Sequence, residues 1–205
     1  MRTKKTPGIV IRKNAVNEKN CAVLILSPFF GKIDAYAKGA RNIKSKFTGH
    51  LDLLNVCDFE IYDGPGSNIV TECSLKKNFP NFSKDLKKFF FSSLIAKILI
   101  KFTNENENSE DIYNLCIGTF NALEKYPKED VIFESFKIKF CDLLGSLPDL
   151  EDLKNTEFQH FDESLKQTLN TLYSATYENI QNVRLNKQQK EQLKQTTDNF
   201  LALAS

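Results

Sequence analysis

The feature of this sequence that most limits its possible folds is a change of hydrophobic period near residue 80. Before that point, short apolar runs with strand-like alternation are separated by turn residues. After Phe82, the apolar residues recur with the period of helices. With 205 residues the chain is long enough for two small domains. We therefore predict an α+β chain with a β domain over residues 1–80 and an all-helical domain over residues 81–205.

The β domain is expected to contain five short strands. They are predicted at about residues 8–13, 21–27, 31–38, 53–63 and 68–77. In the third strand, Ile33 belongs to the set of positions that would pack and Tyr36 to the set that would face solvent or a ligand. The turn 63–66, Asp-Gly-Pro-Gly, makes the last two strands a hairpin. Five short strands suggest a small barrel, although an SH3-like barrel or a five-strand meander would give the same pattern.

The remainder of the chain is expected to be helical. Helices are predicted at about residues 84–102, 111–125, 131–144, 163–174 and 187–204. Ser83 is the expected cap of the first, which is apolar on nearly every side and should be the buried helix of its domain. Its apolar stretch is too short to span a bilayer and contains Lys97 and Lys101. The N-terminus does not have the pattern of a signal peptide, so we expect a cytoplasmic protein without a membrane partner.

The five cysteines indicate reduced thiols rather than a disulfide framework. Their number is odd and none of them forms a C-x-x-C pair. Cys21, Cys57 and Cys73 fall on apolar strands, where a cysteine behaves as a small core residue. We expect these three side chains to be buried.

Positive charge is concentrated in the first domain. Residues 1–80 contain 13 Lys and Arg against 7 Asp and Glu, whereas residues 81–205 contain 15 against 19. Because local potential attracts a polyanion, the first domain is the candidate for binding one. Lysines that only keep the domain soluble would give the same count.

The most informative segment is the connection at residues 38–50, which has four cations, one aromatic residue and no acid. Glycines near both ends permit sharp turns, and mobile cations on a surface loop suit phosphate binding. Arg41, Lys44 and Lys46 are therefore the predicted phosphate contacts.

The adjoining strand offers a surface that could accept a nucleobase. Lys32 and Lys38 share a strand face with Tyr36, and a ring beside cations is typical of proteins that bind single strands. Tyr36 could instead only cover the barrel. We expect Phe47 to fold back onto the core rather than to stack on a base.

Several ordered segments resemble the RecO family. In the first domain they are Gly8–Arg12, Gly31–Ile33, Ala37–Arg41, Lys44–Phe47 and Gly49–Leu51, and in the second they are Phe79-Pro80, Phe136, Lys139 and Leu143–Gly145. The resemblance covers residues 7–148. It implies that the barrel is an OB-fold and that Arg12 joins the DNA-binding residues, which are then Arg12, Lys32, Tyr36, Lys38, Arg41, Lys44 and Lys46.

The resemblance also implies a function and a set of partners. RecO proteins are DNA repair and recombination mediators that anneal single-stranded DNA, cooperate with RecR and help to load RecA onto DNA coated by single-stranded-DNA-binding protein. The family captures the acidic C-terminal tail of that coating protein in its helical domain. The candidates for tail binding here are Phe136, Lys137 and Lys139; lysines on a helix are otherwise usually just solvated.

No metal, cofactor or enzymatic activity is expected. Many family members have two C-x-x-C pairs around zinc after the segment that corresponds to residue 148, but this chain has neither, and His160 alone could not hold the ion. Annealing requires no nucleotide, and the sequence contains no phosphate-binding P-loop motif and no recognisable nucleophile motif. Two alternatives remain open: a protein-interaction adaptor that barely contacts DNA, and an RNA-binding OB protein.

Overall fold

The structure is a computed structural model that describes residues 2–150 and 163–204. The chain divides into two compact units, Met1–Asn114 and Leu115–Ser205. The first unit therefore extends beyond the strands and includes the first helices. Among the described helices, none combines the length and the apolar character that crossing a membrane requires.

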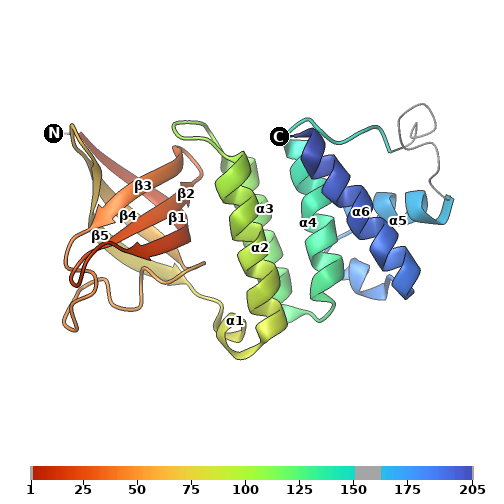
Figure 1. The fold of residues 1–205 in the computed structure, drawn as a ribbon, viewed down its shortest axis with the longest axis horizontal. Coiled ribbons are helices and arrows are strands. Elements are labelled where there is room, and N and C mark those ends of the chain that lie inside the picture. The colour runs from red at the N-terminus through yellow and green to blue at the C-terminus, as the bar shows by residue number, and fades with distance from the viewer. Residues whose placement is uncertain (1, 151–162, 205) are drawn as a thin grey trace. The chain divides into compact units, whose positions relative to one another are not determined.

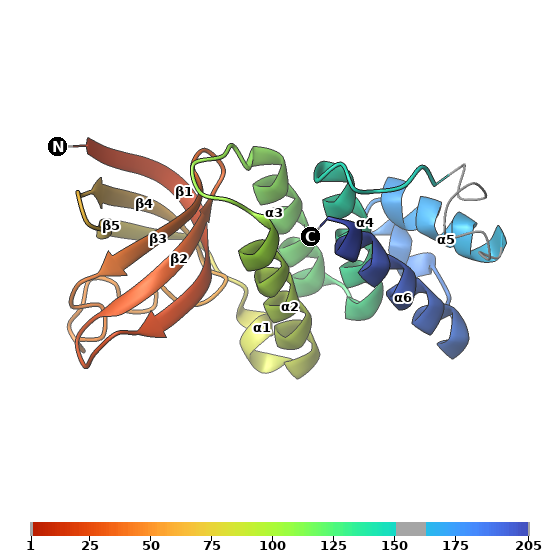
Figure 2. The same cartoon turned by 45° about the horizontal axis from the view of Figure 1, so that its top comes forward.

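Five strands form a closed barrel at the start of the first unit (Figures 1 and 2). They are β1 (Arg2–Ala15), β2 (Cys21–Ser27), β3 (Gly31–Ala37), β4 (Val56–Asp63) and β5 (Asn68–Lys77). Their order around the barrel is β1-β2-β3-β5-β4, with β3 and β5 parallel and the other pairs antiparallel. A meander would place β4 beside β3, so this order excludes it. The five-stranded, closed arrangement is that of the expected OB-fold.

Two strand boundaries differ from the prediction for reasons that local sequence does not reveal. The first strand begins at Arg2 because residues 2–9 pair with β4, for example Thr6 with Phe59. Lysines and threonines in this segment hide the strand pattern. The fourth strand begins only at Val56, because Leu54 adopts a left-handed backbone conformation with φ 69°, which no strand residue adopts.

The interior of the barrel is filled mainly by alternate residues of β2, β3 and β4, to which β1 and β5 add Val10 and Val70. Along β3, Ile33, Ala35 and Ala37 are buried while Asp34 and Tyr36 are exposed, which confirms the predicted alternation. Of the three strand cysteines, two are buried and Cys73 is half-buried against the same core. Cross-strand burial of apolar side chains is the main source of stability of such a barrel.

Three helices follow the barrel, and the first differs from the prediction. They are α1 (Pro80–Lys84), α2 (Leu86–Phe102) and α3 (Glu110–Lys125). The expected cap Ser83 is wrong: it lies inside the one-turn helix α1, and its hydroxyl donates to the Pro80 carbonyl at 2.9 Å. The cap of α2 is Asp85, whose Oδ1 accepts from the backbone amides of Lys87 and Lys88 at 2.8 and 3.3 Å.

We expect Asp85→Ala to lower the free energy of unfolding by about 1 kcal/mol, because two amides of the first turn lose their acceptor. Urea denaturation followed by circular dichroism measures this change. Ser83→Ala is the matched control, since the Ser83 hydroxyl donates only to a carbonyl within its own helical turn. This variant should change the free energy of unfolding by less than half as much. Equal effects of the two variants would contradict the assignment of the cap.

The connection between α2 and α3 packs on the start of β3 within the first unit. The backbone amide of Lys32 donates to the Asn104 carbonyl at 2.9 Å, and that of Asn106 donates to the Phe30 carbonyl at 2.9 Å. Gly31 has φ +63°, and a Cβ atom there would lie 2.2 Å from the Asn104 oxygen. Only glycine allows this approach, so the barrel and α2 are joined through backbone contacts.

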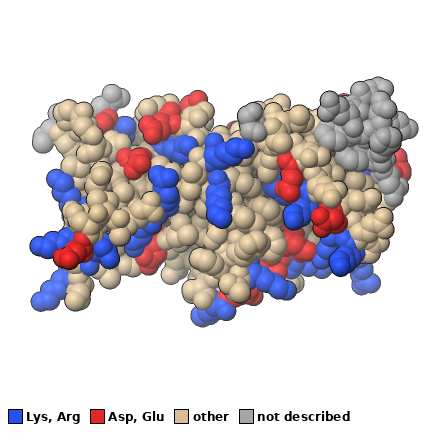
Figure 3. Space-filling model, in the orientation of Figure 1, with Lys and Arg blue, Asp and Glu red and all other residues tan. Residues whose placement is uncertain are grey.

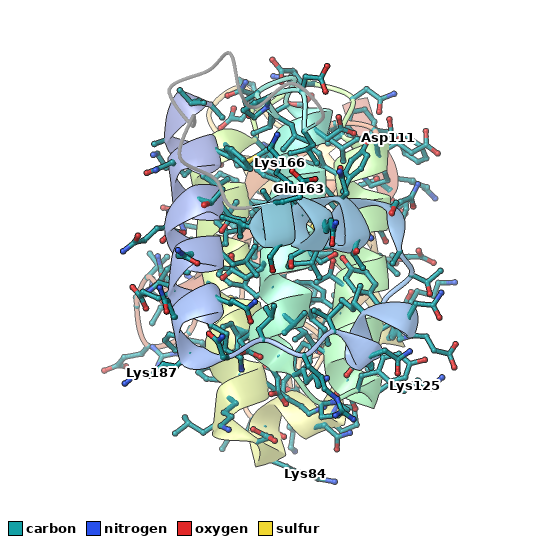
Figure 4. The ribbon with its side chains drawn as sticks, turned by 90° about the vertical axis from the view of Figure 1, so that its right-hand side faces the viewer. Lys84, Asp111, Lys125, Glu163, Lys166 and Lys187 are labelled. Carbon is teal, nitrogen blue, oxygen red and sulfur yellow. The ribbon has the colours of Figure 1, made fainter. Side chains whose placement is uncertain are left out.

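The second unit is built around α4 (Glu129–Leu143), which is buried over most of its length. It is contacted by α5 (Glu163–Ser174), η2 (Asn179–Asn182) and α6 (Lys187–Leu203). Figure 4 shows α5, which carries the labelled Glu163 and Lys166, crossing α4, and α6 running from the labelled Lys187. The short η2 was not predicted, because a single turn has no detectable period.

Candidate nucleic-acid interface

Residues 38–55 connect β3 to β4 entirely through turns and irregular backbone, and we refer to this segment as the cationic loop. Its second half is anchored to the barrel. Phe47 and Leu51 insert into the barrel core and are 4% and 0% exposed, which confirms the prediction for Phe47. His50 Nδ1 lies 3.0 Å from the Cys73 carbonyl, and the Asn55 amide donates to the Gly49 carbonyl at 2.8 Å.

The first half of the cationic loop rests on the connection between β1 and β2. Gly39, at φ +69°, makes the predicted sharp turn, and its amide donates to Asn20 Oδ1 at 2.9 Å. The Arg41 amide donates to the Lys19 carbonyl at 3.0 Å, and its guanidinium donates to the Asn17 carbonyl. No sequence signal indicated this support, because it joins two connections that are separated by two strands.

The four cations of the cationic loop are exposed: Lys38, Arg41, Lys44 and Lys46. Within residues 2–150 and 163–204, none of them has a carboxylate oxygen within the 4.0 Å limit of an ion pair. The ammonium of Lys46 lies 5.5 Å from the centre of the Phe47 ring. Figure 3 shows basic side chains projecting from the end of the barrel that carries this loop in Figure 1. Unpaired cations at a protein surface are available to phosphates.

Two further side chains of the cationic loop and its adjoining strand reach solvent. Tyr36, on the outer face of β3, is 41% exposed, so its ring has an accessible face. At the tip of the loop, Ile43 is 97% exposed between polar neighbours. Packing within the chain does not explain an apolar side chain in that position.

The other two predicted DNA contacts already have partners in the structure. Arg12 lies 3.6 Å from Asp34 in an ion pair whose members are about half exposed, and such a pair contributes little to stability and can be exchanged. The Lys32 ammonium donates to the Ile100 carbonyl at 2.7 Å, in the last turn of α2. A cation at a helix C-terminus satisfies a free carbonyl and the helix dipole, so Lys32 has a structural role.

In the second unit, the residues predicted to bind a partner occupy structural positions. Phe136 is 0% exposed and Lys137 is 1% exposed. The Lys137 ammonium lies 2.7 Å from both Glu134 and Asp198. Lys139 donates to the Ala175 carbonyl at 3.0 Å, and burial lowers its pKa. No contact made within the described part of the chain supports a partner-binding role for these three residues, which stays a prediction.

No group of three or more His, Cys, Asp or Glu side chains that could hold a metal ion is present among the described residues. His160, which we predicted to be an ordinary histidine rather than a ligand, lies outside them.

Comparison with known proteins finds a family model that matches the barrel and relatives whose match is longer than the barrel. Residues 1–79 match the family model described as "Recombination protein O N terminal". The chain is 33% identical over 152 residues to "DNA repair protein RecO" of Caldanaerobacter subterraneus subsp. tengcongensis, a match that covers 74% of this chain and 62% of that protein. It is 31% identical over 153 residues to the protein of the same description from Thermoanaerobacter sp., with the same coverage. For Alkaliphilus metalliredigens the identity is 27% over 147 residues, covering 71% and 60%. The chain thus spans about three fifths of the length of these relatives.

Proposed function

Because this chain belongs to the RecO family, we propose that it acts in DNA repair and homologous recombination by binding and annealing single-stranded DNA. The observation that carries the proposal is the cationic loop on the end of an OB barrel: its four cations are exposed and have no carboxylate partner among the described residues. OB-folds bind oligonucleotides with the face of their second and third strands and with the loops between strands 1 and 2 and between strands 4 and 5. Tyr36 lies on β3, and the cationic loop that follows β3 rests on the connection between β1 and β2. The proposed contacts are Tyr36, Lys38, Arg41, Lys44 and Lys46, and Arg12 joins them if its pair with Asp34 opens.

The mechanism follows from electrostatics. Two complementary strands repel each other through their phosphates, and a surface that neutralises several phosphates lowers this repulsion and releases counterions. Base pairing then supplies the driving force. Annealing by this route needs no nucleotide hydrolysis and no catalytic residue. The loop is held at both ends, by Gly39 and Asn55, so its cations stay grouped without an entropic cost of ordering the whole segment on binding.

The partners of the family belong to the same proposal. We propose that the chain cooperates with a RecR protein and acts on DNA coated by single-stranded-DNA-binding protein, whose acidic tail it would bind, and so helps to load a RecA recombinase. Support for this part comes from family membership alone.

Salt titration tests whether the chain contacts DNA directly. We expect the affinity for a fluorescent single-stranded oligonucleotide to fall steeply as salt rises, by roughly 0.7 log unit per phosphate contact for each log unit of salt. Fluorescence anisotropy at several salt concentrations measures the slope. A slope near zero would refute direct DNA binding and favour an adaptor that acts through protein partners. Tighter binding to RNA of the same sequence would favour an RNA-binding role.

A further inference from the structure

The first half of α2 exposes three large apolar side chains: Leu86, Phe89 and Phe90, at 82%, 46% and 55% exposure. Their spacing puts them on one face of the helix, and we refer to them as the aromatic platform. The sequence pattern predicted that this helix would be buried, and for its first turns the prediction is wrong. Single exposed apolar side chains are common on soluble proteins, but a cluster of them usually marks a binding surface.

A cavity of about 260 Å³ lies beside the aromatic platform within the first unit. Its apolar lining comes from two segments far apart in the sequence: Leu53 and Leu54 of the cationic loop, and Phe79, Phe82 and Phe89 of the α1–α2 region. The rings of Phe79 and Phe82 stack with their centres 5.0 Å apart. The cavity therefore connects the platform with the cationic loop.

The charge around the aromatic platform is positive. Lys77, Lys84 and Lys87 are exposed and have no ion pair in the part of the chain that the structure describes. Lys77 lies 5.6 Å above the Phe79 ring, and Figure 4 shows Lys84 pointing away from the ribbon at the end of α1.

The two nearby acids are already engaged. Asp85 caps α2 through its Oδ1 atom, as described above. Asp52 pairs with Lys13 at 2.9 Å. The unpaired charge beside the platform is therefore cationic, and it would attract an anionic ligand.

We infer that the aromatic platform is a second contact for single-stranded nucleic acid, on which nucleobases stack while Lys77, Lys84 and Lys87 contact the phosphates. This inference rests on the proposed function and extends its interface along the chain. Exposed rings beside cations suit a ligand that is both polyanionic and aromatic, and every base has a face that can stack on phenylalanine. The cationic loop supplies both the phosphate contacts and a wall of the cavity, so a single strand bound to the loop could continue onto the platform.

The test compares the full-length Phe89→Ala/Phe90→Ala double variant with the wild type. Single-stranded oligo-dT of about 30 nucleotides is the ligand, and an abasic strand of the same length is the reference, since it keeps the phosphates but has nothing to stack. We expect the double variant to bind oligo-dT about tenfold more weakly, with an unchanged salt slope and nearly unchanged binding of the abasic strand. Phe29→Ala is the matched control, because Phe29 is 54% exposed and belongs to neither the platform nor the cavity.

A reporter variant keeps the test decisive if the double variant is destabilised. The chain contains no tryptophan, so Phe89→Trp introduces a single tryptophan, whose emission can be excited selectively, and it preserves an aromatic ring in the platform. Oligo-dT should quench its emission by stacking, whereas Phe29→Trp should show no quenching.

The outcomes separate the two proposals. Wild-type binding of oligo-dT without any salt slope would overturn the proposed function. A steep slope together with normal binding by the double variant and no quenching of Phe89→Trp would overturn only this inference. The same holds if the double variant binds DNA normally but no longer binds a fluorescent acidic peptide that contains phenylalanine, because the platform would then serve a protein partner.

Discussion

Replacing Arg41, Lys44 and Lys46 together with alanine is expected to weaken single-stranded DNA binding about 50-fold at 0.15 M salt and to reduce the salt slope by about 2, which is the loss of three phosphate contacts. These cations have no carboxylate partner in the described structure. Their replacement therefore leaves no acid without its ion pair. Thermal stability should change little, because exposed loop cations contribute little to folding. Anisotropy titrations across salt concentrations and a thermal melt measure the two effects.

The matched control for this variant removes the same charge from the second unit. Arg184, Lys187 and Lys194 are exposed cations there, and their combined replacement with alanine should change DNA affinity less than about threefold. If both triple variants lose affinity equally, net charge rather than the cationic loop determines binding. If the loop variant binds and anneals DNA like the wild type, the proposed contacts are wrong.

Lys137→Ala is expected to lower the free energy of unfolding by about 3–5 kcal/mol, because it leaves the carboxylate of Glu134 buried without its cation. Glu134 is 7% exposed and also accepts a hydrogen bond from the Thr197 hydroxyl. Urea denaturation of the full chain measures the loss. Lys190→Ala is the control, since it breaks an ion pair with Asp130 at 2.6 Å whose members are both exposed, and it should cost less than about 1 kcal/mol.

The loss caused by Lys137→Ala should depend on pH. Burial raises the pKa of Glu134 in the folded protein, against the opposing attraction of Lys137. A carboxyl whose pKa is higher in the folded than in the unfolded state favours folding while it is protonated, and this contribution is lost as pH rises through the folded pKa. Removal of Lys137 makes the charged form of Glu134 even less favourable in the folded protein. The destabilisation should therefore be largest at neutral pH, and it should shrink as pH falls and Glu134 takes up a proton.

A compensating variant distinguishes the charge effect from lost packing. Lys137→Met/Glu134→Gln removes both charges and keeps an acceptor for Thr197, so it should recover more than half of the stability lost in Lys137→Ala. If Lys137→Ala costs no more than Lys190→Ala, or if the compensating variant recovers nothing, the ion pair is not what holds this part of α4.

Hydrophobic period was enough to determine the class of the fold and most of its elements. The strand at residues 68–77 and the helix at residues 163–174 have the predicted bounds. In a half-buried strand and in an amphipathic helix, the apolar residues recur with the period of the element itself, so the local sequence is enough to identify it. Residues 38–50 of the cationic loop were also evident from the sequence, since four cations without an acid stand out without knowledge of any contact. The glycine at residue 39 makes the turn that its position predicted.

The partners of individual side chains were decided only by the tertiary structure. The sequence predicted that Lys32, Lys44 and Lys137 would all lie at the surface. In the structure, Lys32 donates to a carbonyl in the last turn of a helix that begins 54 residues later. Lys44 is free among the described residues, and Lys137 is buried between carboxylates. Similarly, the exposed face of α2 could not be predicted, because a helix that is apolar on every side carries no sign of which side is covered. The order of residues that are close in the sequence sets secondary structure, because these residues are neighbours along one helix or strand. Exposure and charge pairing depend instead on contacts between segments that are distant in the sequence.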